Sequence, residues 1–295
     1  MRASFDPRAL LWLLGAISTF ATMDAAAKWL GQTYPLLAGV WIRYLIPTVL
    51  LGGYLIAKKG RHFAHAAQPK IQIARGITLV TSTAFFWLAL ANLPLVEAAV
   101  VSFVCPTIVV LLSSFVLNER PARAHWIALV LGFVGVLIAL RPGLTHTGIG
   151  AFAALASATF YATYIVLTRK VAGEVDALPL LFHSNAVGAL LLTVASPAFF
   201  QLPQGLEWPL LIGIGTFGLF GHWCMIRAYA LATATALAPF MYVQLAFSTF
   251  WGWLVFNRLP DSFTLVGVAF ILAGGFVALR YERGRAASVA SATPE

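Results

Sequence analysis

Charged residues are scarce in this chain of 295 residues, and their scarcity excludes an ordinary soluble fold. Lys, Arg, Asp and Glu together make up 10% of the sequence, whereas hydrophobic residues make up 60%. Soluble domains contain about 25% charged residues. The longest connection between apolar stretches, 58–72, is short and basic, so no room remains for a soluble domain. The sequence therefore predicts a protein that lies in a membrane along almost its whole length.

Residues that bind metals or carry out catalysis are also few. The two cysteines, Cys105 and Cys224, each lie within an apolar stretch and have no second ligand at metal spacing, so we predict neither a metal nor another cofactor. The segment 213–218 matches a dinucleotide fingerprint, but no strand precedes it and no βαβ unit surrounds it. Paired aspartates, a Ser with a nearby base and a His-Glu-x-x-His motif are all missing, which argues against an intramembrane enzyme.

Ten apolar stretches are each long enough to cross a bilayer, which needs about 20 residues per helix. The predicted fold is an all-α membrane protein of ten transmembrane helices. The spans are predicted at 9–30, 37–57, 73–92, 96–117, 125–141, 148–168, 178–199, 208–230, 233–256 and 262–281.

The net charge of +9 is distributed unevenly over these spans. If the N-terminus is cytoplasmic, all Lys and Arg residues except Lys28, Arg43, Arg141 and Arg258 fall at or near cytoplasmic helix ends. This asymmetry predicts that both termini are cytoplasmic. Anionic lipid head groups account for the basic charge, so no nucleic-acid partner is predicted. The polar residues Asp24 and Lys28 argue that the first span is not a cleaved signal peptide.

The two halves of the chain repeat each other weakly. An offset of 139 residues aligns the loop motif 118–121 (Asn-Glu-Arg-Pro) with 257–260 (Asn-Arg-Leu-Pro), and an offset of 141 aligns Lys28 with Arg169. Each half holds five predicted spans, and because five is odd the second half enters from the opposite side. Inverted repeats with a site at their interface are typical of secondary transporters. The predicted divisions are repeats at 1–143 and 144–285, followed by a disordered tail at 286–295.

These paired loops, each leading into a Gly-rich helix, and the sequence Met-Asp-Ala-Ala-Ala-Lys-Trp-Leu at 23–30 with Pro35 and Arg43 beyond it, resemble EamA-type members of the drug/metabolite transporter superfamily. The resemblance covers about the whole chain. It implies a central cavity lined mainly by the first, third, fourth, sixth, eighth and ninth helices, and a bacterial inner membrane as the location. The second loop has Arg258 where the first has Glu119, which argues against a catalytic role for this carboxylate.

Charged groups within the spans are candidates for function, because each costs roughly 2.5–3.5 kcal/mol at the centre of a helix. Asp24 and Lys28 are four residues apart and share a helix face, and Arg43 is predicted at the depth of Asp24. One interpretation is a structural Asp24–Arg43 pair, with Lys28 extended to the outer interface. The other is a docking site for a zwitterion, in which Lys28 or Arg43 meets a carboxylate and Asp24 meets an amine.

Three residues are candidates for carrying a coupling proton: Asp24, Glu97 and His222. Desolvation favours the protonated form of a carboxyl group, and a histidine titrates near neutral pH. Two simpler roles remain open, because Glu97 begins a helix, where it complements the helix dipole, and His222 can hydrogen-bond a neighbouring helix.

Aromatic and amide side chains within the spans complete the predicted substrate site, since a cavity with aromatic walls and few polar groups suits a small organic solute. These residues are Trp87, Tyr161, Tyr164, Tyr242, Gln244 and Ser248. Pro47, Pro106 and Pro239 interrupt the second, fourth and ninth spans and permit kinks, which are either gating hinges or ordinary features of membrane helices.

The predicted function is that of a secondary transporter that moves a small organic metabolite by alternating access, with a proton as the candidate coupling ion. The favoured substrate is an amino-acid-like or amino-acid-derived zwitterion, such as a metallophore, which is exported. The alternative is uptake of a planar aromatic metabolite such as riboflavin. A more remote alternative is a membrane receptor or scramblase that does not transport a solute.

Overall fold

The computed structural model describes residues 6–60, 68–119, 121–140, 148–172, 175–257 and 262–291. Within these ranges the chain is helical, and its β-structure is limited to an isolated bridge between Ala172 and Val175. The prediction of an all-α protein is therefore confirmed. The helices are α1 (Pro7–Leu30), α2 (Leu36–Lys59), α3 (Pro69–Asn92), α4 (Leu95–Ser102), α5 (Cys105–Val116), α6 (Arg123–Leu140), α7 (Ile149–Val171), α8 (Ala177–Ala195), η2 (Ser196–Ala198), α9 (Glu207–Leu231), α10 (Ala234–Leu237), η3 (Ala238–Val243), α11 (Gln244–Phe256) and α12 (Ser262–Ser291).

Seven segments of the described chain are long and apolar enough to cross a membrane. They correspond to the first four predicted spans and to the sixth, seventh and eighth, so the protein is a multi-pass membrane protein. α6 and α12 contain shorter apolar stretches, Arg123–Gly135 and Leu265–Ala278. The ninth predicted span is divided into α10, η3 and α11.

Two of the predicted spans are broken near a proline. The fourth is interrupted at Phe103 and Val104, between α4 and α5, and Pro106 follows in the first turn of α5. Proline has no N–H with which to bond the carbonyl of Ser102, four residues earlier. The ninth changes to a 3-10 helix that includes Pro239. Both interruptions were predicted. The third predicted interruption, at Pro47 in the second span, is wrong, because Pro47 lies inside the continuous helix α2. A role as hinges stays a prediction.

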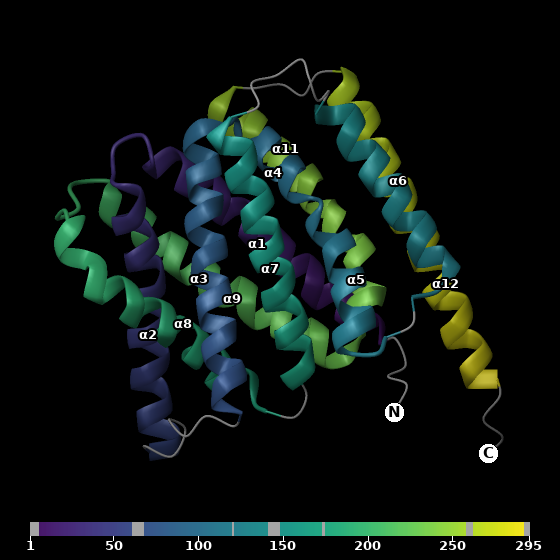
Figure 1. Ribbon diagram of the computed structural model, residues 1–295, viewed down its shortest axis with the longest axis horizontal. Coiled ribbons are helices and arrows are strands. Elements are labelled where there is room, and N and C mark those ends of the chain that lie inside the picture. Colours follow the sequence, from purple (N-terminus) through teal and green to yellow (C-terminus); the bar gives the residue numbers. More distant parts are fainter. Residues whose placement is uncertain are drawn as a thin grey trace.

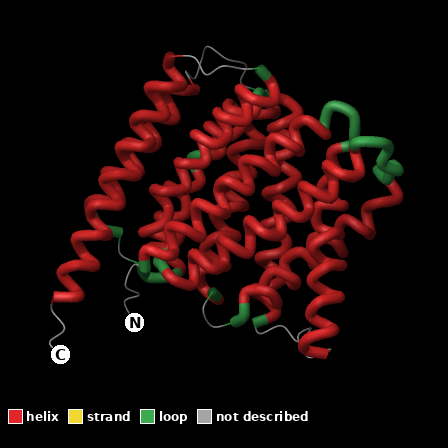
Figure 2. The backbone as a smooth tube through the Cα atoms, turned by 180° about the vertical axis from the view of Figure 1, so that it is seen from behind, coloured by secondary structure: helices red, strands yellow, loops and turns green. Residues whose placement is uncertain are grey.

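The helices form a bundle in which segments from the two halves of the chain lie side by side. α1 packs against α9, α3 against α7, and α2 against α8. α6 and α12 pack along each other at one edge of the bundle, as Figures 1 and 2 show from opposite sides. The broken segment α4–α5 packs against α7, and η3 and α11 pack against α1.

The first residues of the two loop motifs share a left-handed backbone conformation. Asn118 and Asn257, which the repeat aligns, have φ angles of 52° and 50°. Asparagine is one of the few residues other than glycine that adopts this left-handed conformation. Arg120, Arg141 and Arg258–Pro260 lie outside the described residues. The predicted disordered tail is corrected in part, because α12 continues to Ser291, and residues 292–295 are again outside the described part.

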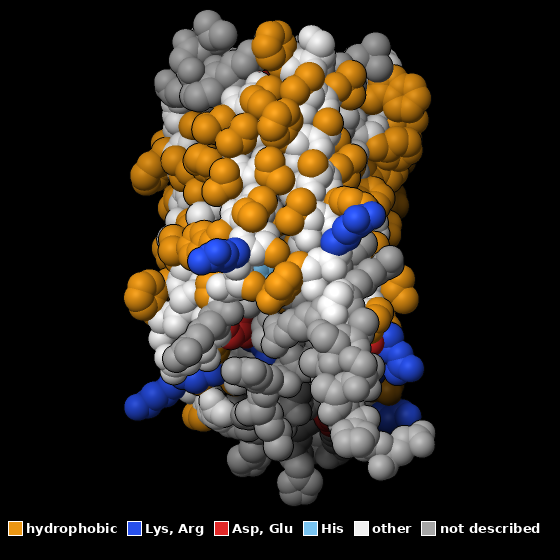
Figure 3. Space-filling model, turned by 90° about the vertical axis from the view of Figure 1, so that its right-hand side faces the viewer, with side chains coloured by type: hydrophobic (Ala, Val, Ile, Leu, Met, Phe, Trp, Pro, Cys, Tyr) orange, Lys and Arg blue, Asp and Glu red, His pale blue; other side chains and the backbone are white. Residues whose placement is uncertain are grey.

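The surface is apolar in a broad band. Phe115 is 80% exposed and Val194 is 77% exposed, which would be costly in water but suits contact with lipid. Figure 3 shows hydrophobic side chains over the upper and middle parts of the face formed around α6 and α12, and the visible Lys and Arg side chains of the described residues from about mid-height downward.

Candidate functional site

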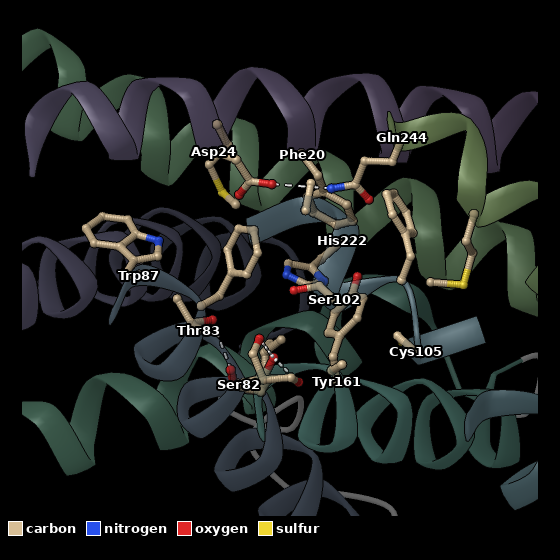
Figure 4. A pocket seen from close by; sticks show the side chains of 18 of the residues that line it. Phe20, Asp24, Ser82, Thr83, Trp87, Ser102, Cys105, Tyr161, His222 and Gln244 are labelled. Atoms are coloured by element: carbon tan, nitrogen blue, oxygen red, sulfur yellow. Dashed lines mark hydrogen bonds between the residues drawn. The ribbon is translucent and has the colours of Figure 1, made fainter. Parts of the chain in front are cut away.

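A cavity lies between the two halves of the chain, with an empty volume of ≈ 750 Å³. α1, α3, α4–α5, α7, α9, η3 and α11 line it, with one residue from α2, whereas α6 and α12 contribute none of the described lining. This is the set of helices that the family resemblance implied, with α2 added. The polar lining residues are Asp24, Arg43, Ser82, Thr83, Ser102, Ser157, His222 and Gln244. Phe20, Phe86, Trp87, Phe103 and Tyr161 provide aromatic walls (Figure 4).

Arg43 is the cation of this cavity and is held by three neutral side chains. Its Nε lies 3.4 Å from the sulfur of Met23, and Nη1 donates to Oγ1 of Thr83 at 3.1 Å. Nη2 lies 3.2 Å from Nε2 of His222. Because a guanidinium only donates, Nε2 of His222 must accept this bond, and the proton of the imidazole is on Nδ1. Nδ1 faces the hydroxyl oxygen of Tyr164 at 3.5 Å.

Asp24 lies on α1 and is 4% exposed. Its Oδ2 accepts a hydrogen bond from Nε2 of Gln244 at 3.3 Å, drawn as a dashed line in Figure 4. In the described structure, Asp24 and Arg43 form no direct ion pair, because the guanidinium is directed to Thr83 and His222 instead. The interpretation in which these two residues form a structural pair is therefore wrong for this conformation. Both charges line one cavity and neither neutralises the other by contact.

Lys28 lies outside the cavity lining. Its Nζ donates to the carbonyl oxygens of Leu90 and Leu93, each at 2.8 Å, where α3 ends. A cation is favourable at this position because the last carbonyls of a helix have no partner within the helix. Lys28 therefore neither extends freely to the interface nor faces the cavity. Glu97 is also absent from the lining and lies in the first turn of α4, which agrees with the simpler helix-dipole interpretation.

The predicted aromatic and polar residues divide into two groups. Trp87, Tyr161 and Gln244 line the cavity, whereas Tyr164, Tyr242 and Ser248 do not. Tyr164 stacks on Tyr161 with ring centroids 5.9 Å apart and lies behind it. The rings of Tyr242 and Phe103 lie 5.5 Å apart, and Ser248 is 1% exposed in α11. The structure thus brings six predicted residues together, counting Asp24, Arg43 and His222, while their binding role stays a prediction.

The hydroxyl groups of the third span line the site but were not predicted as part of it. Oγ of Ser82 donates to the carbonyl oxygen of Ser157 on α7 at 3.0 Å, and Thr83 bonds Arg43. A polar residue midway along an apolar span was a signal. It was a weak one, because hydroxyls in helices commonly bond their own backbone, as Thr83 also does with Leu79 at 2.9 Å.

Residues 7–141 and 148–280 each match the EamA-like transporter family. The chain belongs to this family. It is therefore a transporter of the drug/metabolite superfamily and not an enzyme.

Three relatives illustrate how the family varies in its substrates. A pseudopaline exporter of Pseudomonas aeruginosa is 30% identical over 273 residues, covering 90% of this chain and 94% of the relative. An S-adenosylmethionine uptake transporter of Rickettsia prowazekii is 25% identical over 263 residues, with 89% of each chain covered. A riboflavin transporter of Vibrio cholerae is 26% identical over 267 residues, again with 89% of each chain covered.

One solved crystal structure has the same fold. It superposes with a TM-score of 0.77 at 22% sequence identity, covering 94% of this chain and 98% of that chain. This likeness establishes the arrangement of the helices and says nothing about the substrate.

Proposed function

We propose that this transporter carries an amino-acid-derived zwitterion through the central cavity. The observation that carries the proposal is that Arg43 and Asp24 line the same aromatic-walled space without pairing with each other. An unpaired buried charge is costly unless a partner of opposite sign arrives. A zwitterion supplies both partners at once, with its carboxylate at Arg43 and its amine at Asp24.

The walls of the cavity suit the remainder of such a molecule. Phe20, Trp87 and Tyr161 offer faces for an aromatic or aliphatic side chain, while Ser82 and Ser102 offer hydroxyls. S-adenosylmethionine, named for one relative, combines an amino-acid zwitterion with an aromatic base. The pseudopaline exporter supports export as the direction.

We propose further that the ten spans form two inverted repeats that alternate access to this cavity. If the halves exchange, the contact of α1 with α9 becomes that of α7 with α3, and the contact of α2 with α9 becomes that of α8 with α3. The described helices make all four of these contacts. The two family matches and the left-handed Asn118 and Asn257 support the same division. In this arrangement both termini face the cytoplasm of a bacterium, and the protein lies in its inner membrane.

A flux measurement tests the substrate proposal. Liposomes that contain the purified protein and are loaded with radiolabelled S-adenosylmethionine are expected to release it. In a separate binding titration in detergent, Arg43→Gln is expected to raise the Kd for S-adenosylmethionine roughly tenfold, because a charge-assisted hydrogen bond to the substrate is lost. Arg227→Gln is the matched control, because Arg227 lies exposed on α9 with its guanidinium over the ring of Trp223. Equal Kd values for the wild type and Arg43→Gln would contradict the proposal.

The second candidate is transport of a planar aromatic metabolite such as riboflavin. The aromatic rings of Phe20, Phe86, Trp87, Phe103 and Tyr161 around the cavity favour it, as does the riboflavin transporter among the relatives. Riboflavin has no carboxylate, so its flux would be insensitive to Arg43→Gln. Binding without flux of either compound would instead favour a receptor.

A further inference from the structure

Arg75 is a second buried cation, outside the cavity. It lies on α3, two helical turns from Thr83, and is 0% exposed. Among the described residues no carboxylate forms an ion pair with it, and its Nη2 has no hydrogen-bond partner. Ionisable residues within membrane spans commonly mark substrate or ion pathways. The distribution of basic residues along the chain accounts for an Arg near the cytoplasmic end of a helix, but not for its complete burial.

The groups around Arg75 hold the guanidinium without neutralising it. Nε donates to Oγ1 of Thr168 at 3.1 Å, and Nη1 donates to Oε1 of Gln72 at 2.6 Å and to the carbonyl oxygen of Leu180 at 3.3 Å. The carbon at the centre of the guanidinium lies 5.4 Å from the ring centroid of Tyr164. Four fixed neutral neighbours orient the group, while one of its nitrogens keeps its hydrogens free for an acceptor.

Two side chains, His222 and Tyr164, separate Arg75 from Arg43. From Arg43, the path runs over His222 at 3.2 Å, then from His222 to the hydroxyl of Tyr164 at 3.5 Å, and then from the Tyr164 ring to Arg75. His222 lines the cavity, and Tyr164 lies behind Tyr161. Along this path of contacts His222 and Tyr164 lie between the two guanidiniums, and we call these two side chains the floor of the cavity.

We propose that Arg75, oriented by Gln72 and Thr168, is a second binding site for the carboxylate of the substrate, occupied when this floor opens. This inference rests on the proposed function, since it assumes that the carboxylate binds Arg43 in the cavity. During export the carboxylate passes Arg75 before Arg43, because Arg75 lies nearer the cytoplasmic end of α3. Moving a carboxylate through a low-dielectric interior without a counter-charge is costly. Transfer from one guanidinium to the next keeps the carboxylate paired along the path. Arg75 therefore binds the substrate only when the floor is open, and it takes no part in binding to the cavity as described.

The test compares S-adenosylmethionine with decarboxylated S-adenosylmethionine, which lacks only the carboxylate. In Arg75→Gln, the Kd for S-adenosylmethionine in detergent is expected to stay within about twofold of the wild type, while its flux from liposomes falls roughly tenfold. Flux of the decarboxylated compound is expected to be unchanged. Arg75→Lys, which retains the cation, is expected to recover part of the flux, and Arg227→Gln is the control.

Other results would overturn the inference. An equal loss of flux for both compounds would mean that Arg75 only supports the fold, and unchanged flux for both would mean that the carboxylate does not use it. If Arg75→Gln does not fold, Thr168→Val is used instead, because it removes one hydrogen bond to the guanidinium of Arg75. A smaller loss of flux that affects S-adenosylmethionine but not the decarboxylated compound would support the site. An equal loss of flux for both compounds would overturn it. Failure of S-adenosylmethionine to bind the wild type, or binding indifferent to Arg43→Gln, would instead remove the proposed function and this inference with it.

Discussion

Lys28 and Arg169, which the internal repeat aligns, make equivalent contacts in the two halves of the transporter. Lys28 near the end of α1 donates to carbonyl oxygens at the end of α3, and Arg169 near the end of α7 donates to the carbonyl oxygen of Tyr229 near the end of α9 at 2.7 Å. In inverted repeats these two contacts fall at opposite ends of the bundle. We therefore expect each to help close one end of the transport path.

Replacing Lys28 tests closure at the outer end. Lys28→Met removes the donor for two helix-terminal carbonyls, each a charged hydrogen bond of about 1.5–3 kcal/mol. We expect a lower melting temperature in detergent and faster hydrogen exchange at the end of α3. The Kd for S-adenosylmethionine should stay within about twofold, since Lys28 does not line the cavity. A strongly weakened Kd with unchanged stability would return Lys28 to the binding site.

Glu119 joins the Arg169 contact, which we expect to close the inner end in the proposed topology. Its carboxylate lies 3.4 Å from Nε of Arg169 and accepts from the backbone N–H groups of Ala234 and Thr235, at 3.4 and 3.1 Å. Glu119→Gln removes the negative charge from all three contacts. We expect faster hydrogen exchange in α10, measured by mass spectrometry, and an altered rate of exchange transport.

Glu207→Gln is the matched control for Glu119→Gln. Glu207 also accepts from a backbone N–H, that of Gln204 at 2.8 Å, but at an exposed site with no described cation pairing to it. Its replacement should change exchange only near α9. If exchange in α10 is the same in Glu119→Gln and in the wild type, Glu119 does not hold the inner end closed.

Gly39 provides space for the wall residue Trp87. A Cβ at Gly39 would lie 2.5 Å from Cζ3 of Trp87, so Gly39→Ala must displace the indole from the cavity wall. We expect a loss of substrate affinity of roughly tenfold, at a cost of about 1–3 kcal/mol for overpacking. Gly53→Ala on the same helix meets nothing within 4 Å and should be neutral or slightly stabilising. Titration of both variants with S-adenosylmethionine distinguishes them, and equal affinities would argue against Trp87 as a wall of the site.

Asp24 is the cavity carboxylate that we expect to carry a coupling proton. Asp24→Asn keeps a partner for Gln244 but cannot change charge. An inward-directed proton gradient should accelerate export by the wild type and have no effect on the variant. His222→Gln, which keeps an acceptor for Arg43, should retain the response. The opposite pattern would assign proton coupling to His222. Loss of folded Asp24→Asn protein would indicate a structural role.

Tyr34, in the connection between α1 and α2, makes stability depend on alkaline pH. Its hydroxyl donates to the carbonyl oxygen of Gln201 at 2.6 Å. Burial and, secondarily, the negative charge of Glu207 raise the pKa of Tyr34 above its ordinary value. In the unfolded chain the phenol ionises near pH 10, so the stabilisation is complete below about pH 10 and is lost as the pH rises through the folded pKa.

Tyr34→Phe should remove this dependence. We expect the variant to be less stable by about 1 kcal/mol at neutral pH, where the hydrogen bond is intact in the wild type. The difference in melting temperature between the two proteins should narrow above about pH 10. A difference that is constant up to strongly alkaline pH would show that the phenol makes no pH-linked contribution.

The amino-acid sequence determined the class of fold and the region of the site. Lipid requires long apolar helices with internal hydrogen bonds, so composition and span length predicted an all-α membrane protein. Pro106 and Pro239 marked the two interrupted spans because a missing N–H is a local property. Asp24, Arg43 and His222 stood out because charged and polar groups are expensive within a span.

The tertiary structure decided which of these residues meet. Asp24 and Arg43 were equally compatible with a pair or an open site, and packing of α9 and α3 beside α2 brought His222 and Thr83 to the guanidinium instead. Lys28 shares a helix face with Asp24, yet the end of α3 captures its ammonium group. Arg75 looked like an ordinary basic residue near a helix end, and only the packing of α7 and α8 around α3 buries it. Partners from distant helices depend on long-range packing, which sequence spacing along one helix does not encode.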